Sequence, residues 1–153
     1  MPRESDQPSL GSPTDLAAPS EIRDFPIVFF DGVCGLCNIS VDFILARDTR
    51  HRFRFAPLQG DTAHQRLPPA DVERLDTLIL LTATGTYRRS AAVVRILWGM
   101  PGIWPLVGVV VWMIPWPLRD LGYRIISAHR LQWFGKKETC RIPTPEERER
   151  FLP

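Results

Sequence analysis

The sequence predicts an α/β sandwich, in which helices cover the faces of a small mixed β-sheet. Two patterns predict it: residues 25–56 read as strand, helix, strand, and residues 77–99 read as strand, strand, helix. The chain has 153 residues, of which 44% are hydrophobic and 24% are charged. This length and composition are typical of one globular domain with a single hydrophobic core.

The first unit of the predicted fold is a βαβ unit. Residues 25–30 form an apolar run that ends at Asp31-Gly32, which is typical of a buried strand. Apolar side chains over 36–48 cover a wide helical face, with Asn38 outside it, and residues 52–56 alternate between polar and apolar as a second strand does. Because a helix connects the two strands, we expect them to be parallel neighbours with a right-handed crossover.

The second unit is a β-hairpin that leads into a helix. A polar stretch, 59–76, precedes the hairpin, and its proline pair predicts one short helix around 70–75. Residues 77–82 are rich in β-formers and read as a strand. A turn around Gly85 and a return strand at 87–88 complete the hairpin.

A helix then closes the predicted core, and a helical extension follows it. Ser90 is a preferred N-cap residue for this helix and Gly99 a preferred stop. The predicted core therefore covers 25–99. Residues 100–153 are expected to form a helical C-terminal extension packed on that core, with its main helix at 118–134.

Residues 103–116 form an almost wholly apolar segment that contains three tryptophans and two prolines. A membrane-spanning helix needs about 20 such residues, and a shorter run is more often a buried helix or an interfacial segment. We expect the segment to be buried in the protein. The alternatives are contact with a membrane surface or with a partner, and a membrane span.

The N-terminal segment, 1–24, is rich in serine and proline and is expected to be a disordered tail. It lacks the basic start and apolar run of a secretory signal, which favours the cytoplasm. The net charge of +2 is too balanced for a protein whose main partner is a polyanion, so we expect no nucleic-acid partner.

The pattern Cys34-Gly-Leu-Cys37 lies between the first strand and the first helix. At a helix N-terminus the free N–H groups and the helix dipole stabilise a thiolate. Cys34, expected to be the more exposed thiol, would attack a disulfide, and Cys37, one turn into the helix, would resolve the mixed disulfide. Gly35 leaves space for a partner chain. Such a thiol–disulfide exchange site needs no metal and no organic cofactor.

Asp31 follows the first strand and adds a carboxyl group to this site. Desolvation there would favour its protonated form and make it a proton acceptor for Cys37, although it could also simply cap the turn or the helix. Two alternatives to redox chemistry stay open. The cysteines could be inert packed residues, or they could be half of a zinc site. The other possible zinc ligands are Cys140, His51, His64 and His129.

The segment Phe29-Phe-Asp31-Gly-Val-Cys34-Gly-Leu-Cys37-Asn38 resembles the signature of the DCC family of thiol-disulfide oxidoreductases, which is named after its Asp-x-x-Cys-x-x-Cys motif. Later stretches resemble the family pattern too, and the likeness covers about residues 25–151. These stretches are Tyr87-Arg-Arg-Ser-Ala91-Ala, Tyr123-Arg-Ile-Ile-Ser-Ala-His129-Arg130, Phe134-Gly135 and Cys140-Arg-Ile-Pro143. The resemblance implies a thioredoxin-like fold and an enzyme that exchanges disulfides through Cys34 and Cys37, with Asp31 as the third motif residue.

One departure from thioredoxins concerns the cis-proline that faces their cysteine pair. Asp76-Thr77 occupies the corresponding place here, so we expect either that substrates dock differently or that Thr77 fills that role through its backbone. Among the weaker candidates, Cys140 is expected to be a packed thiol and His129 a helix-face residue. The arginines at 47, 50, 52 and 54 are expected to be solvated.

The sequence therefore predicts a thiol-disulfide oxidoreductase whose partner is a protein or a small thiol or disulfide. The main alternative is a membrane-surface or protein-interaction module that uses residues 103–116. A zinc-binding module is the third possibility.

Overall fold

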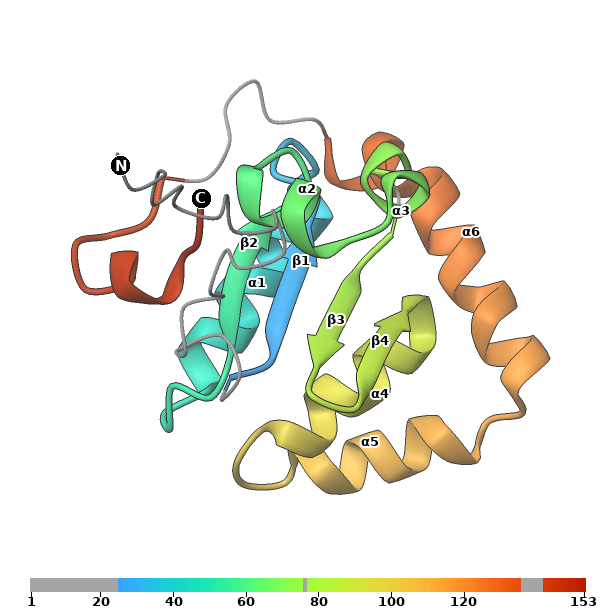
Figure 1. Ribbon diagram of the computed structural model, residues 1–153. Helices are drawn as coiled ribbons and strands as arrows, with labels where there is room; N and C mark the ends of the chain where they lie inside the picture. The colour runs from blue at the N-terminus through green and yellow to red at the C-terminus, as the bar shows by residue number, and fades with distance from the viewer. Residues whose placement is uncertain (1–24, 76, 136–141) are drawn as a thin grey trace, which may run out of the picture.

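The computed structural model describes residues 25–75, 77–135 and 142–153, and the expected tail at 1–24 lies outside them. The fold is mixed α/β and thioredoxin-like, as predicted, with a helical C-terminal part (Figure 1). Its sheet has the strand order β2-β1-β3-β4. β1 pairs in parallel with β2 and antiparallel with β3, and β3 pairs antiparallel with β4. The strands are β1 (Ile27–Phe30), β2 (Arg54–Pro57), β3 (Ile79–Thr82) and β4 (Gly85–Arg88).

The central strand β1 is buried on both faces, which explains why its sequence is a continuous apolar run. Alternate side chains enter two different cores. Val28 and Phe30 pack in the core under α1 (Gly35–Arg47) and α4 (Arg89–Gly99). Ile27 and Phe29 pack in the core on the opposite face, under two short helices, α2 (Asp61–Arg66) and α3 (Pro69–Glu73). Helices thus cover both faces of the sheet (Figure 1).

Two local expectations are wrong. The polar stretch before β3 contains two short helices, because α2 forms in addition to α3; the amide of Thr62 in α2 donates to the carbonyl of Pro153 at the end of the chain. Ser90 is not the N-cap of α4, since that position is Arg88. Ser90 lies inside the first turn, where its hydroxyl accepts a hydrogen bond from Nε of Arg119 at 3.2 Å.

The C-terminal part contains α5 (Trp104–Met113) and α6 (Trp116–Phe134). α5 packs on α4, and α6 rises along the side of the molecule to the end of the sheet where α1 begins (Figure 1). The expectation that residues 103–116 are buried is wrong, because most of their large side chains are exposed. Only one side of α5 faces α4, where Gly108 lets the Trp98 ring approach closely.

The last residues cover the outer edge of the sheet. Phe151 bridges to Phe55 of β2, and the amide of Leu152 donates to the Phe55 carbonyl at 2.8 Å. A 3-10 helix, Arg148–Arg150, precedes this contact. Among the described residues, no helix is both long and apolar enough to cross a membrane.

Candidate functional site

The cysteine pair lies where β1 ends and α1 begins. Cys34 is the N-cap residue of α1, with extended backbone angles of φ −82° and ψ 125°, and Cys37 lies in the first helical turn. The amide of Cys34 donates to the Asp31 carbonyl at 3.3 Å, which closes the turn between strand and helix. The helix therefore begins where the motif predicts, with both cysteines at its N-terminal end.

Asn38 holds this turn from inside the protein. Its side-chain amide donates to the carbonyls of Gly32 at 3.1 Å and Cys34 at 2.7 Å. The sequence pattern placed Asn38 outside the apolar face of the helix, yet it is fully buried. These two bonds offset the cost of burying the amino group, whereas the buried Oδ1 of Asn38 has no hydrogen-bond partner among the described residues.

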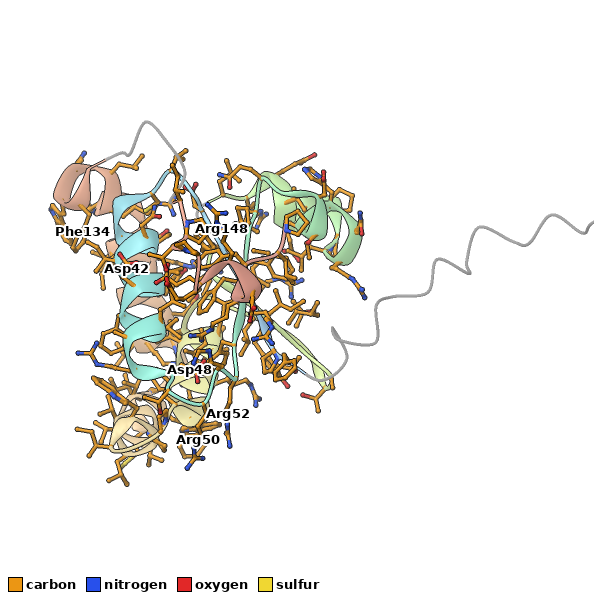
Figure 2. The ribbon with its side chains drawn as sticks, turned by 90° about the vertical axis from the view of Figure 1, so that its left-hand side faces the viewer. Asp42, Asp48, Arg50, Arg52, Phe134 and Arg148 are labelled. Carbon is orange, nitrogen blue, oxygen red and sulfur yellow. The ribbon has the colours of Figure 1, made fainter. Side chains whose placement is uncertain are left out.

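The relative exposure of the two cysteines is the reverse of the sequence-based expectation. Cys34 has 0% of its surface exposed, whereas Cys37 is only partly buried. The end of α6 lies against the start of α1: the amide of Gly35 donates to the Gly135 carbonyl at 3.3 Å, and Phe134 lies beside the N-terminal end of α1 (Figure 2). The space left by Gly35 is thus filled by this chain itself.

Replacing Gly35 with alanine should expose Cys34. A Cβ atom at Gly35 would clash with the Phe134 carbonyl oxygen, so the end of α6 has to move away. We expect Cys34 to react several-fold faster with iodoacetamide, as measured by mass spectrometry of the labelled peptide. Gly122→Ala in α6 is the matched control, since its Cβ would meet nothing within 4 Å. Equal labelling of both variants would contradict this account.

Asp31 forms a hydrogen-bonded cluster beside the pair and is almost fully buried. Its Oδ1 accepts hydrogen bonds from the Val33 amide at 3.1 Å and from the side-chain amide of Gln59 at 2.8 Å. Its Oδ2 accepts one from Nη2 of Arg130 at 3.3 Å. The carboxyl group therefore caps the turn before the helix and also has a cationic partner.

Arg130 of α6 joins three parts of the site. Besides Asp31, its Nη2 bonds the carbonyl of Leu75 at 3.1 Å, and its Nη1 donates to Sγ of Cys37 at 3.7 Å. Arg130 is the last residue of the family-like stretch that begins at Tyr123, but its role in the site was not predicted from the sequence. The available signal was its position seven residues after Tyr123 and four after Ile126, on the side of α6 that faces the core.

The environment of Cys37 favours its neutral thiol. Burial, the negative charge of an ionised Cys34 and a hydrogen bond with Cys34 raise the pKa of Cys37 from 9.0 to about 12. A hydrogen bond from the Asp31 backbone and the charge of Arg130 act in the opposite direction, with smaller effect. Cys37 thus stays protonated at neutral pH.

This shifted pKa predicts an alkaline loss of stability. The raised pKa means that the folded protein keeps a proton on Cys37 that the unfolded chain releases above pH 9.0. The contribution of this proton to the free energy of unfolding should therefore be fully present below pH 9. It should decrease by about 1.4 kcal/mol per pH unit as the pH rises toward 12. Denaturant unfolding of the reduced protein at pH 8 and pH 10.5 should show this loss, and Cys37→Ala should lack it. If the wild type and Cys37→Ala lost the same unfolding free energy between pH 8 and pH 10.5, the raised pKa of Cys37 would be contradicted.

An apolar cavity of about 440 Å³ opens beside Cys37 rather than beside Cys34. It lies between α1, α4, α5 and α6, and its size is within the range of ligand pockets. Polar groups in its wall are few, chiefly the guanidinium groups of Arg119 and Arg130 and three serine hydroxyls. The apolar part of the wall includes Leu36, Leu78, Val93, Val111, Ile114, Leu118 and Ile126.

The remaining candidates lie apart from the site. His129 is exposed on α6, where it stacks on Trp133 and hydrogen-bonds the Ile125 carbonyl. Arg47 lies over the Phe43 ring at 4.0 Å. Within the described ranges, no three His, Cys, Asp or Glu side chains come together as metal ligands would. Cys140 lies outside the described residues, and Thr77, buried before β3, keeps its suggested docking role as a prediction.

Comparison with known proteins agrees with this geometry. The profile of the DCC1-like thiol-disulfide oxidoreductase family matches residues 28–136. The uncharacterized protein YuxK of Bacillus subtilis is 36% identical over 129 residues, which cover 83% of this chain and 93% of YuxK. The DCC family protein At1g52590, chloroplastic, of Arabidopsis thaliana is 29% identical over 122 residues, 76% of this chain and 69% of that protein. No solved structure matches the chain. The chain belongs to the DCC1-like thiol-disulfide oxidoreductase family, as its Asp-x-x-Cys-x-x-Cys motif indicates.

Proposed function

We propose that this oxidoreductase works by dithiol–disulfide exchange, with Cys34 as the attacking thiolate and Cys37 as the resolving thiol. The observation that carries the proposal is the difference between the two cysteines. Cys34 caps α1, where the helix N-terminus favours an anion, whereas burial raises the pKa of Cys37 to about 12. This difference assigns the attack on the substrate disulfide to Cys34 and the resolving step to Cys37.

The exchange proceeds in two steps. The Cys34 thiolate attacks one sulfur of a substrate disulfide, whose S–S bond breaks, and the second substrate sulfur leaves as a thiolate that takes up a proton. Cys37 then loses its proton and attacks Sγ of Cys34, forming the Cys34–Cys37 disulfide and releasing the other substrate thiolate. Two electrons and two protons pass from the dithiol to the substrate disulfide, and the reverse sequence oxidises a substrate dithiol.

Arg130 and Asp31 support the second step, which has the larger barrier because Cys37 is protonated. The Arg130 guanidinium touches Sγ of Cys37 and stabilises the thiolate as it forms. Asp31 holds that guanidinium in place through its hydrogen bond, and its carboxyl group would receive the proton. We assign Arg130 a positioning and electrostatic role and Asp31 the role of proton acceptor.

The partner we propose is a protein or a small disulfide in a reducing compartment such as the cytosol. Close cysteine pairs there are more often catalytic than structural. The apolar cavity beside Cys37 supports a partner that carries an apolar group next to its reacting sulfur.

A trapping experiment tests the proposed roles. Cys37→Ser removes the resolving thiol, so incubation with glutathione disulfide should leave one glutathione attached to Cys34, detected by mass and removed by dithiothreitol. Cys34→Ser should not accumulate an adduct at neutral pH, because Cys37 stays protonated. Adduct on Cys37 instead of Cys34 would reverse the assignment. If neither variant forms an adduct and the pair shows no reversible redox titration, the proposal fails.

The midpoint potential of the pair then gives the direction of electron flow. A value of about −270 mV is that of a reductant, and a value of about −120 mV is that of a strong oxidant. Equilibration of the wild-type protein with glutathione or dithiothreitol buffers measures it.

A further inference from the structure

The two C-terminal helices expose a continuous series of large apolar side chains, here called the apolar face. On α5, Leu106, Val109, Val110 and Met113 follow the spacing of one helical stripe, and 44–72% of each residue's surface is exposed. On α6, Leu118, Leu121 and Ile125 continue the series at the same kind of spacing. Its other members are Ile103, Trp112, Ile114 and Trp116.

This face is too apolar to be ordinary solvent-exposed surface. No residue between Arg95 and Arg119 carries a charge. α5 and the start of α6 meet at one corner of the molecule, away from the sheet, so the exposed side chains of both helices belong to one region (Figure 1). Large contiguous apolar patches mark sites that contact a membrane, a partner or a ligand.

The charge around the face favours one occupant. The segment 89–126, which forms α4, α5 and the first half of α6, contains four arginines and a single acidic residue, Asp120. That carboxylate is already paired with Arg89 and Arg124. In a dimer formed through this face, the arginines of one copy would face those of the other, and like charges facing each other oppose association. An anionic lipid surface, in contrast, would attract these arginines.

The length and composition of the segment fit a bilayer surface as well. α5 has 10 residues, too few to cross the hydrocarbon core but enough to lie along the interface with its apolar side inserted. Tryptophans such as Trp112 and Trp116 are preferred at the headgroup level. We infer that the apolar face docks on an anionic membrane surface, with α5 and the first half of α6 lying in the interface.

Docking in this way orients the redox site. Ile114, Leu118 and Ile126 are exposed and also line the cavity that reaches Cys37. The cavity is therefore continuous with the apolar face. On a membrane it would face the lipid, and the thiol pair would be presented to disulfides held at or in the bilayer.

Vesicle flotation with the full-length protein tests the inference. Wild-type protein should float with vesicles of phosphatidylcholine mixed with phosphatidylglycerol, bind much less to vesicles of phosphatidylcholine alone, and dissociate as salt is raised. The double variant Val110→Glu, Met113→Glu should bind at least about tenfold more weakly, since it replaces inserted apolar groups with anions. Ile142→Glu is the matched control, because Ile142 is 82% exposed but outside the face, and it should bind like wild type.

Several results would overturn the inference. One is no flotation of the wild type with either vesicle, and another is equal flotation of the double variant. A third is a stable wild-type dimer in lipid-free solution that Val110→Glu, Met113→Glu converts to a monomer, since a second copy would then cover the face. Cys34→Ser should float normally, so this test does not depend on the proposed exchange reaction.

Discussion

Replacing Arg130 with methionine should slow disulfide exchange by about 10- to 100-fold, the equivalent of one hydrogen bond to a charged group. The guanidinium is the cationic contact of Cys37 Sγ and lowers the pKa of that thiol. Without it, the pKa of Cys37 rises further and the resolving thiolate forms less often. The same change leaves Asp31 buried without its cation, which should cost about 3 kcal/mol of unfolding free energy.

Three measurements separate these effects. Stopped-flow exchange with glutathione disulfide gives the rate, denaturant unfolding gives the stability, and the pH dependence of thiolate absorption gives the titration of the pair. Arg130→Lys keeps the charge and should restore part of the rate. Arg124→Met on the exposed side of the same helix should change little. An Arg130→Met protein that is unstable but exchanges at the wild-type rate would assign Arg130 a purely structural role.

The Arg150→Met variant should lose about 3–5 kcal/mol of unfolding free energy, as expected for breaking a buried ion pair. Arg150 extends from the C-terminal 3-10 helix to Asp48 at the end of α1, and both side chains are buried. Asp48 also accepts hydrogen bonds from the amides of Arg52 and Phe53, so its charge cannot move to solvent. Burial lowers the pKa of Arg150 and Asp48 opposes that effect, which makes the pair interdependent.

Thermal unfolding should show a decrease in Tm of roughly 6–20 °C for this variant. Arg148→Met is the control, since Arg148 lies in the same 3-10 helix but is exposed. Figure 2 shows Asp48 at the opposite end of α1 from Phe134, so the loss should leave the cysteine environment intact. The double variant Asp48→Asn, Arg150→Met should recover part of the stability. A decrease no larger than that of Arg148→Met would contradict the assigned role of the pair.

The sequence predicted the sheet well because burial and periodicity determine each strand locally. β1 is a continuous apolar run because it lies between two cores, and the β3–β4 hairpin follows from its turn residues. α2 could not be predicted in the same way, since a six-residue polar helix gives little periodicity and one of its amides is bonded by the distant Pro153. The apolar composition of α5 did not reveal whether other protein segments would cover it.

The position of the cysteine pair was also predictable, because spacing and the strand-to-helix junction are local features. Arg130 was not, since it lies 93 residues from Cys37 in sequence and reaches it only because α6 returns to the start of α1. The exposure of Cys34 was predicted wrongly for the same reason. Its cover is provided by Phe134 and Gly135, whose approach depends on tertiary structure.

In the contact between Gly35 and Gly135, the end of α6 occupies the place at the start of α1 where a partner chain would bind. A segment held next to its site by covalent connection acts at an effective concentration of about millimolar. A partner present at micromolar concentration must therefore bind the start of α1 about a thousandfold more strongly than the Gly135 carbonyl does. A small disulfide such as glutathione disulfide should therefore react with Cys34 only slowly and at millimolar concentration, whereas a partner that binds the start of α1 should react faster.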